Sequence, residues 1–417
     1  MTDDLCFHRT TCRLCGSEDL ELVFGLAPTP PANAFVGEAD LDKSQPRFPL
    51  DVYFCSQCGH VQLLDVVDPA HLFENYVYVS GTSPVFVKHF EGYADAVVTK
   101  TGAASGDLAV DIGSNDGTLL GFFKAHGLKV LGIDPAKDIA ATATEQGIPT
   151  EAGFFTPDWA AKTRETKGPA RIITANNVFA HIDDMEAVTT GIRTLLADDG
   201  VYVFEVSYLV DVIEKTLFDT IYHEHLAYHA VKPLKRFLAE QGLELFAAER
   251  VNSHGGSLRG YAQLANGPHR ADGSVEALIA LEAAMGLDKA ETFRAFAGQI
   301  NQRREELSGL LRQAKDEGRS VAAFGAPAKA TTLMYHFGIG PEIIDFIVDD
   351  SPLKQGLYSP GMHIPVLPSS ALYDRKPDDV VILAWNFAEA IAAKHTAFTA
   401  DGGRFIVPLP TVEVLSP

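Results

Sequence analysis

Two Cys-x-x-Cys pairs near the start of the chain constrain its fold more than any other feature of the sequence. Cys12 and Cys15 form the first pair, Cys55 and Cys58 form the second, and a glycine follows each. A two-residue spacer lets both thiolates of a pair face one tetrahedral ion, and four thiolates leave no coordination position open. We therefore expect a structural Zn²⁺ site, with a small sub-domain folded from residues 16–54 between the pairs. The alternative is four reduced thiols without a metal.

The rest of the chain alternates short apolar runs with amphipathic stretches, which is typical of parallel βαβ sheets. At 417 residues it is also too long for one ordinary core. We expect an α/β protein with three parts: a zinc-binding lobe (1–72), a Rossmann-like core (73–285) and a smaller α/β domain (286–417). A long polar helix is expected over 287–317. The predicted strands are 108–112, 129–133, 171–175, 200–206, 244–251 and 257–264 in the core, and 321–324, 344–348, 380–384 and 404–407 beyond it.

Charge and hydropathy limit the kinds of partner that the chain can have. The net charge is −21, from 34 basic and 55 acidic residues, and no Lys/Arg cluster appears. Because nucleic-acid binders carry a basic face, a nucleic-acid partner is not expected. The acidic start of the chain is unlike a secretory leader, and no apolar run reaches the roughly 18 residues that span a bilayer. We therefore expect a cytoplasmic protein, monomeric or weakly oligomeric, without a membrane partner.

Residues 110–119 read V-D-I-G-S-N-D-G-T-L and join an apolar strand to a helix. Glycines at such a bend let the backbone approach a nucleotide closely. Their spacing is Gly-x-x-x-Gly, so the Gly-x-Gly-x-x-Gly turn that binds a dinucleotide pyrophosphate is absent. The pattern resembles motif I of the class I methyltransferases, whose cofactor is S-adenosylmethionine; a chance pair of turn glycines is the alternative. The cofactor contacts that we expect are Gly113, Asn115, Asp134 (facing the ribose diol) and Asn176.

Residues 221–229, I-Y-H-E-H-L-A-Y-H, bring three histidines, two tyrosines and a glutamate close together in the sequence. A helical zinc site needs His-Glu-x-x-His, whereas His223 and His225 are two residues apart and would diverge on a helix. Proton transfer fits better, because histidine titrates near neutrality, a carboxylate such as Glu224 can orient it, and a tyrosine such as Tyr222 can stabilise an oxyanion. The alternative is a set of ordinary core or surface residues. His181 follows another predicted strand, and the sequence favours neither a packing nor a functional role for it.

Together, the cysteine pairs, the D-I-G-S-N-D-G loop and the Y-H-E-H segment resemble the zinc-containing sugar C-methyltransferases along essentially the whole chain. Residues 73–83 resemble the segment that covers the active site in that family. The resemblance implies methyl transfer from S-adenosylmethionine to C-3 of a dTDP-linked 4-keto deoxysugar or deoxyaminosugar, in antibiotic deoxysugar biosynthesis. It also implies the catalytic roles, with His225 as the base and Tyr222 as the enolate stabiliser, surrounded by Glu224, Tyr76 and His181.

The same resemblance implies that the third part of the chain binds the nucleotide sugar. Residues 324–329, F-G-A-P-A-K, follow a predicted strand and open a helix, so that backbone N–H groups and Lys329 can meet phosphate. Asn386, just past another strand, and His254, in a hairpin turn, are the further contacts that we expect. The alternative is a plain strand–turn–helix with a lysine on the surface.

Two other functions make different demands on the sequence. An NAD-dependent nucleotide-sugar oxidoreductase requires the Gly-x-Gly-x-x-Gly turn, which is absent. A zinc-ribbon RNA methyltransferase requires a basic surface, which the net charge opposes. A regulatory protein with an inactive methyltransferase core is a weaker third alternative.

Overall fold

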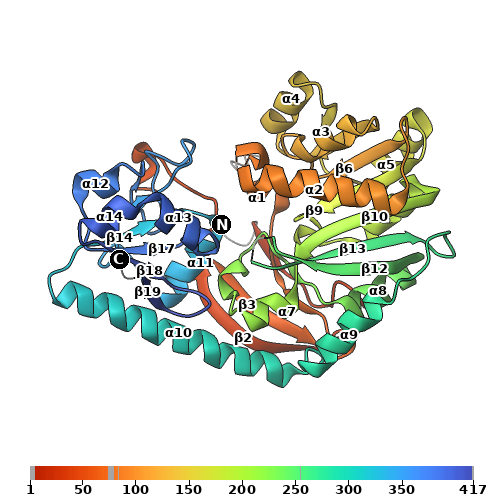
Figure 1. Cartoon of the computed structure of the whole chain (residues 1–417). Coiled ribbons are helices and arrows are strands. Elements are labelled where there is room, and N and C mark those ends of the chain that lie inside the picture. Colours follow the sequence, from red (N-terminus) through yellow and green to blue (C-terminus); the bar gives the residue numbers. More distant parts are fainter. Residues whose placement is uncertain (1–4, 74–78, 83, 254, 416–417) are drawn as a thin grey trace.

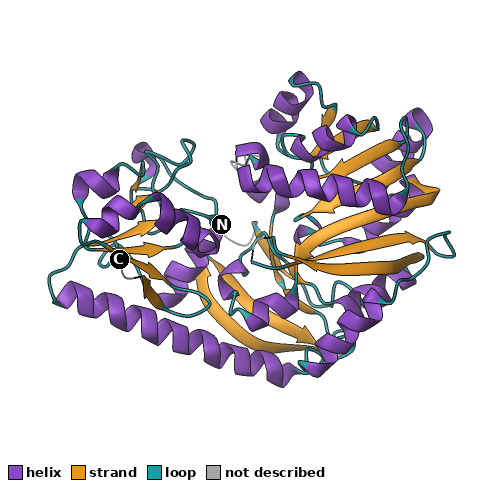
Figure 2. Cartoon of the chain, viewed as in Figure 1, coloured by secondary structure: helices purple, strands orange, loops and turns teal. Residues whose placement is uncertain are grey.

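The computed structural model describes residues 5–73, 79–82, 84–253 and 255–415. The chain forms three sheet-containing regions, which Figure 1 shows side by side, with the long helix α10 (Ala290–Asp316) running beneath them. Helices flank the two larger sheets, as Figure 2 shows. Within the described residues, no helix is long and apolar enough to cross a membrane.

The N-terminal region is built on a four-stranded antiparallel sheet. Its order is β11-β4-β3-β2, and a separate two-stranded sheet pairs β1 with β5. Along β3, buried side chains alternate with more exposed ones until the strand reaches the second cysteine pair, as expected for a sheet with one face in the core. The strands are β1 (Cys6–His8), β2 (Leu20–Thr29), β3 (Phe48–Cys55), β4 (Val61–Leu63), β5 (Asp65–Val67) and β11 (Ala227–Tyr228).

Strand β11 belongs to this sheet although it lies far along the chain. Ala227 pairs with Gln62 and Tyr228 pairs with Val61. The histidine segment is therefore attached to the zinc-bearing region, which the sequence analysis did not anticipate.

The central region has a seven-stranded sheet in the order β12-β13-β10-β9-β6-β7-β8. Strands β8, β7, β6, β9 and β10 are parallel, and the β12–β13 hairpin extends the sheet antiparallel to β10. Every side chain of β6 is buried, because helices cover both faces of such a sheet. The strands are β6 (Leu108–Ile112), β7 (Lys129–Asp134), β8 (Thr150–Ala152), β9 (Ala170–Asn176), β10 (Leu196–Ser207), β12 (Leu243–Val251) and β13 (Ser257–Leu264).

Two helices in the first two regions, α5 and α6, begin at a residue whose side chain caps the helix. Thr156 accepts a hydrogen bond from Trp159 N at the start of α5, and Asp184 accepts one from Ala187 N at the start of α6. The helices are α1 (Pro69–Phe73), α2 (Pro84–Thr101), α3 (Thr118–Ala125), α4 (Lys137–Glu145), α5 (Pro157–Lys167), α6 (Met185–Leu195), α7 (Leu209–Glu214), α8 (Val231–Glu240) and α9 (Ser274–Ala284).

Helix α10 joins the central region to the C-terminal one. It packs against β2, where the rings of Phe24 and Phe296 lie 5.8 Å apart. The C-terminal sheet has six strands in the order β16-β15-β14-β17-β18-β19, all parallel except β19. The elements are β14 (Val321–Phe324), β15 (Ile347–Val348), β16 (Val366–Leu367), β17 (Asp379–Ile382), β18 (Arg404–Val407), β19 (Glu413–Leu415), α11 (Ala328–Phe337), α12 (Ala371–Arg375), α13 (Ala388–Lys394) and α14 (Thr396–Ala400). The predicted α/β class is confirmed.

Candidate functional site

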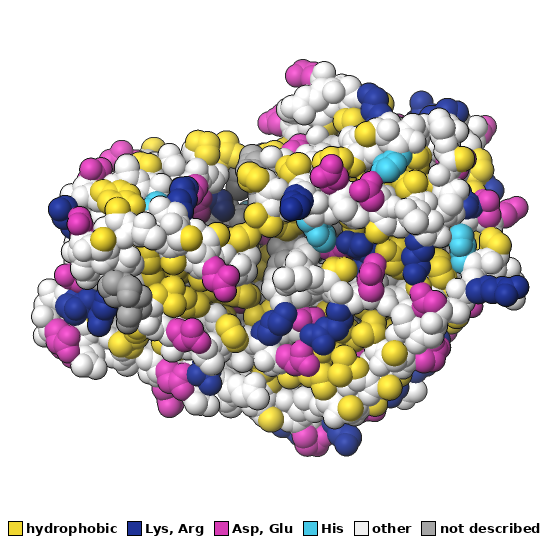
Figure 3. Space-filling model, viewed as in Figure 1, with side chains coloured by type: hydrophobic (Ala, Val, Ile, Leu, Met, Phe, Trp, Pro, Cys, Tyr) yellow, Lys and Arg dark blue, Asp and Glu magenta, His cyan; other side chains and the backbone are white. Residues whose placement is uncertain are grey.

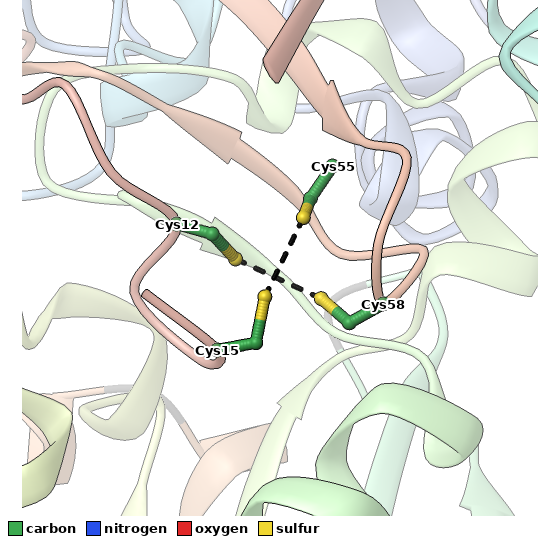
Figure 4. Close-up of side chains that lie close together, drawn as sticks. All are labelled: Cys12, Cys15, Cys55 and Cys58. Carbon is green, nitrogen blue, oxygen red and sulfur yellow. Dashed lines mark hydrogen bonds between the residues drawn. The ribbon is translucent and has the colours of Figure 1, made fainter. Parts of the chain in front are cut away.

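The four predicted metal ligands come together at one point. Their sulfur atoms all lie within 4.8 Å of one another, with Cys12 Sγ 3.7 Å from Cys58 Sγ and Cys15 Sγ 3.6 Å from Cys55 Sγ (Figure 4). Zn–S bonds of about 2.3 Å in a tetrahedron place sulfurs roughly 3.8 Å apart, so the donor set fits Zn²⁺. Gly16 and Gly59, which close the two turns, both have positive φ.

Cys6 lies outside this cluster, in β1, where it pairs with Val67. Burial, together with Asp65, raises the pKa of its thiol to about 11, so it stays protonated at neutral pH. Among the described residues, no other group of three or more His, Cys, Asp or Glu is placed to hold a metal ion.

A single cavity of about 740 Å³ brings most of the other predicted residues together. It lies where the carboxyl ends of the core strands face the first turn of the C-terminal sheet. This is where open α/β sheets bind their ligands. The predicted site residues that line it are Gly113, Asn115, Asp134, Asn176, His181, Tyr222, His225, Lys329 and Asn386. Tyr76 and His254 lie outside the described residues.

The cofactor end of the cavity is formed by the turn after β6. Gly113 has φ +67°, and a Cβ placed there would lie 2.4 Å from Val178 Cγ2, so only glycine fits. The Asp134 carboxylate accepts hydrogen bonds from Asn115 N (2.8 Å) and Ala136 N (2.9 Å). Burial raises the pKa of Asp134, and these two N–H groups oppose that shift. Asp134 therefore holds the turn in shape as well as facing the cavity.

Asn176, at the end of β9, completes this end of the cavity. Both polar atoms of its side chain are buried without a hydrogen-bond partner among the described residues. Buried amides without partners are rare, and a bound ligand is one thing that supplies them. The residues at this end therefore fit S-adenosylmethionine, whose ribose and amino-acid groups need such donors and acceptors.

The histidine end is organised around His225. Its Nδ1 lies 2.7 Å from the carbonyl of Thr220, and its Nε2 lies 3.0 Å from the hydroxyl of Tyr222. Because a carbonyl only accepts, Nδ1 carries the hydrogen of the neutral ring, and the lone pair is on Nε2. The His181 ring stacks on that of His225 at 5.0 Å, and His181 Nε2 is buried without a partner among the described residues. These observations favour a functional role for His181.

Burial changes the titration that the sequence suggests for this histidine. It lowers the pKa of His225 to about 4, although the hydrogen bond to Thr220 opposes the shift. Burial also lowers the pKa of His181 well below its usual value, with His225 adding to the effect. The expectation that His225 titrates near neutrality is therefore wrong: the ring is neutral at pH 7 and is a weaker base than a free imidazole.

The remaining residues of the segment have different surroundings. Glu224 is 2% exposed and accepts a hydrogen bond of 2.7 Å from Asn33 Nδ2, whereas both ring nitrogens of His225 are engaged by other groups. Glu224 thus does not orient that imidazole. His223 faces the carbonyl of Phe48, and His229 stacks on Phe179, so these two histidines are core residues.

The opposite wall of the cavity carries Lys329, in the first turn of α11. Its Nζ donates to Asn386 Oδ1 at 2.8 Å and lies 3.4 Å from the centroid of the Trp385 ring. Burial lowers the pKa of Lys329 to about 8, opposed by the Asp219 carboxylate, so the side chain remains mostly charged at pH 7. Lys329 is half-buried in the cavity wall and hydrogen-bonded to Asn386, unlike the plain surface lysine that was the alternative.

Among the lining residues that were not found from the sequence are Asn33, Thr220 and Lys354. Asn33 comes from the N-terminal region, and Lys354 donates to the Ala326 carbonyl at 2.7 Å. Neither belongs to a recognisable motif, so only the packing of the three regions reveals them. The Y-H-E-H segment does point to its neighbour Thr220, whose contribution is a backbone carbonyl.

Comparisons with known proteins agree with this geometry. Family models match three stretches: a zinc binding domain over residues 12–73, a methyltransferase domain over 88–248 and a C-methyltransferase C-terminal domain over 252–410. The C-methyltransferase NovU of Streptomyces niveus is 35% identical over 97% of this chain and 96% of its own length. The chain belongs to the C-methyltransferase family. It is a zinc-binding protein with an S-adenosylmethionine-dependent methyltransferase core.

Two solved methyltransferase structures each align with less than half of the chain. One is an S-adenosylmethionine-dependent methyltransferase from Clostridium acetobutylicum, with a TM-score of 0.35 and 12% identity, covering 43% of this chain and 92% of that one. Another is magnesium protoporphyrin IX methyltransferase from Synechocystis with bound SAH, with a TM-score of 0.33 and 15% identity, covering 45% and 89%.

Proposed function

We propose that this C-methyltransferase acts at C-3 of a dTDP-linked 4-keto deoxysugar or deoxyaminosugar. The observation that carries the proposal is the shared cavity, in which the cofactor turn, the Tyr222–His225 pair and Lys329 face one another. A carbon atom accepts a methyl group only after it has become nucleophilic. The site therefore needs a base and an oxyanion partner next to the cofactor, and the cavity holds both.

The C-4 ketone makes the C-3 hydrogen acidic, and His225 Nε2 takes that proton. The Thr220 carbonyl stabilises the imidazolium that forms, because it accepts the Nδ1 hydrogen. For this step the hydroxyl of Tyr222 turns from Nε2 to the substrate, which frees the Nε2 lone pair, and donates to the oxygen of the enolate, where it stabilises the developing charge. When bound, S-adenosylmethionine supplies the methyl group that the carbanion-like C-3 attacks.

The Tyr222–His225 contact leaves a second assignment of the base open. Because the hydroxyl lies 3.0 Å from Nε2, His225 can instead take the tyrosine proton and leave a tyrosinate to remove the C-3 hydrogen. The two routes differ in which residue is indispensable for loss of the C-3 hydrogen.

Lys329 and Asn386 orient the substrate from the other side of the cavity. A charged ammonium group in the wall of a cavity attracts phosphate, because the cavity partly excludes the water that would screen it. We place the diphosphate of the nucleotide sugar at Lys329, with the keto sugar directed toward Tyr222. The C-terminal domain (286–417) thus holds the substrate, the core (73–285) holds the cofactor, and the zinc lobe (1–72) supports the histidine segment through β11.

We assign the zinc a folding role. Four thiolates occupy all four tetrahedral positions, so no site is left for a water or a substrate oxygen. His225, Tyr222 and the cofactor turn supply everything that the proposed chemistry requires of the protein.

The product identifies the function directly. The protein is incubated with S-adenosylmethionine labelled with ¹³C in its methyl group and with dTDP-3-amino-2,3,6-trideoxy-4-keto-hexose, and the product is analysed by NMR. A methyl signal coupled to C-3 is the expected result. A methyl group on oxygen, nitrogen or another ring carbon, or no transfer at all, contradicts the proposal.

A further inference from the structure

Arg13 is a buried arginine between two of the zinc ligands, and the proposed mechanism does not use it. Its side chain is 0% exposed, and it follows Cys12 directly in the first cysteine pair. Burial lowers the pKa of its guanidinium to about 10, so the group stays charged at neutral pH. A buried charge of this kind requires partners, and those partners reveal what it does.

The guanidinium reaches toward His225 on one side. Nη1 donates to the carbonyls of Leu63 and, at 3.4 Å, of Leu226, the residue that follows His225. The Leu226 carbonyl also accepts from Leu63 N at 2.9 Å. Arg13 therefore sits where β4 holds the backbone of the histidine segment.

On its other side the guanidinium reaches toward His181. Nε donates to Asp183 Oδ1 at 3.0 Å, and Asp183 lines the cavity two residues after His181. The two segments also meet directly, because Leu226 N donates to the Ala180 carbonyl at 2.9 Å. One planar side chain thus joins the backbone beside His225 to the side chain beside His181.

We propose that Arg13 is a positioning residue that couples the zinc knuckle to the stacked rings of His181 and His225. Metal binding fixes Cys12 and Cys15 on either side of Arg13. The hydrogen bonds of the planar guanidinium then hold the segments that carry His181 and His225 in place relative to the metal site. Lysine cannot do this, because an ammonium is a point charge without a fixed fork. The catalytic consequence rests on the function proposed above; the coupling itself does not.

The chain offers a matched control in Arg9. Its Nη1 also donates to Asp183 Oδ1, at 3.2 Å, while its other hydrogen bonds go to the carbonyls of Thr11 and Asp183 rather than to Leu226. Arg9→Met therefore removes an ion pair with the same carboxylate and leaves the link to the His225 segment in place. In Arg13→Met, conversely, Asp183 keeps Arg9 as a partner.

The test uses zinc-loaded full-length protein labelled with ¹⁵N in its histidines, with ring signals assigned from His225→Asn and His181→Asn. In wild type we expect His225 protonated at Nδ1. In Arg13→Met and Arg13→Lys, which keep one zinc per chain, we expect the His225 and His181 ring signals to move and kcat to fall roughly 10- to 100-fold, because small misplacements in a site are costly. The dissociation constant for S-adenosylmethionine and the KM for the sugar nucleotide should stay near wild type, and Arg9→Met should keep the wild-type spectrum.

Three results overturn the proposal. The first is a wild-type ring spectrum in Arg13→Lys, because a positive charge without the guanidinium geometry would then be enough. The second is an equal change of the ring spectrum in Arg9→Met. The third is loss of zinc in both Arg13 variants, since Arg13 would then belong to the metal site itself. The spectra need no substrate, so they decide this proposal even if wild type transfers no methyl group to the sugar nucleotide, a result that contradicts only the proposed function.

Discussion

The core and the C-terminal domain contain the same kind of turn after a strand, but the two turns present side chains of opposite charge to the cavity. After β6, Gly113 N donates to the carbonyl of Ile133 at 2.8 Å; after β14, Gly325 N donates to the carbonyl of Val348 at 2.7 Å. In both turns an aspartate from the end of the neighbouring strand accepts from the turn backbone. Asp134 does so from Asn115 N at 2.8 Å, and Asp349 does so from Ala326 N at 2.6 Å.

The two turns differ in the side chains that they present to the cavity. The core turn continues through an open loop before α3 and presents the acceptor Asp134. The C-terminal turn enters α11 almost at once and presents the cation Lys329, while Asp349 is not among the residues that line the cavity. The backbone of the two turns is thus alike, and the difference between them lies in the charge of the side chain that each presents to the cavity. On the face in Figure 3, basic and acidic side chains are interspersed.

Alanine in place of each turn glycine should show which of the two turns is the more rigid. A Cβ on Gly325 would lie 2.5 Å from Ala384 Cβ and 3.1 Å from Ala384 N, whereas one on Gly113 would meet only the Val178 side chain. Since backbone cannot move aside easily, we expect Gly325→Ala to lower the free energy of unfolding by about 2–4 kcal/mol and Gly113→Ala by less. Urea unfolding of both variants tests this, and the reverse ranking would mean that the core turn is the stiffer one.

Lys329→Met should weaken substrate binding alone. Hydrogen bonds to charged groups contribute about 1.5–3 kcal/mol, so the KM for the sugar nucleotide should rise roughly 10- to 150-fold. The dissociation constant for S-adenosylmethionine, measured by calorimetry, should not change. Because Asp219 loses a charged neighbour, the unfolding midpoint is measured as a control. An unaltered KM would place the diphosphate elsewhere.

Asp134→Asn is the reciprocal variant and should have a smaller effect. The amide oxygen keeps only one of the two acceptor positions that Asn115 N and Ala136 N use, so we expect a loss of about 1 kcal/mol, or roughly five-fold in affinity for S-adenosylmethionine. The KM for the sugar nucleotide should stay as in wild type. If the variant instead raises that KM and spares cofactor affinity, the two ends of the cavity have been assigned the wrong way round.

Binding at the two ends of the cavity should also depend on pH in opposite directions: substrate binding should weaken at alkaline pH and cofactor binding at acid pH. With a pKa of about 8, Lys329 loses its charge as the pH rises. The KM for the sugar nucleotide should therefore increase about four-fold between pH 7 and roughly pH 8.5. Asp134, whose pKa burial raises, loses its charge as the pH falls, so cofactor affinity should decline only toward acid. A KM that is flat across this alkaline range would show that charge on Lys329 is not used.

Local motifs predicted the parts of the site whose residues are close in sequence. The cysteine pairs and the 110–119 turn are contiguous, and their backbone requirements are visible in glycine spacing, so both were predicted correctly as structures. Packing between regions was not predictable in this way. Asn33 reaches the cavity from the zinc lobe, and β11 joins a sheet built from residues far earlier in the chain. The low pKa of His225 has the same origin, because only the assembled regions bury it.

The central claim is that His225 removes the C-3 proton, and hydrogen exchange tests it without methyl transfer. Wild-type protein and the 4-keto sugar nucleotide are placed in deuterium oxide without S-adenosylmethionine, and loss of the C-3 hydrogen signal is followed by NMR. We expect exchange in wild type, no exchange in His225→Asn, and continued exchange in Tyr222→Phe, since the phenyl ring leaves Nε2 free. Exchange that persists in His225→Asn and disappears in Tyr222→Phe would contradict the claim and make Tyr222 the base.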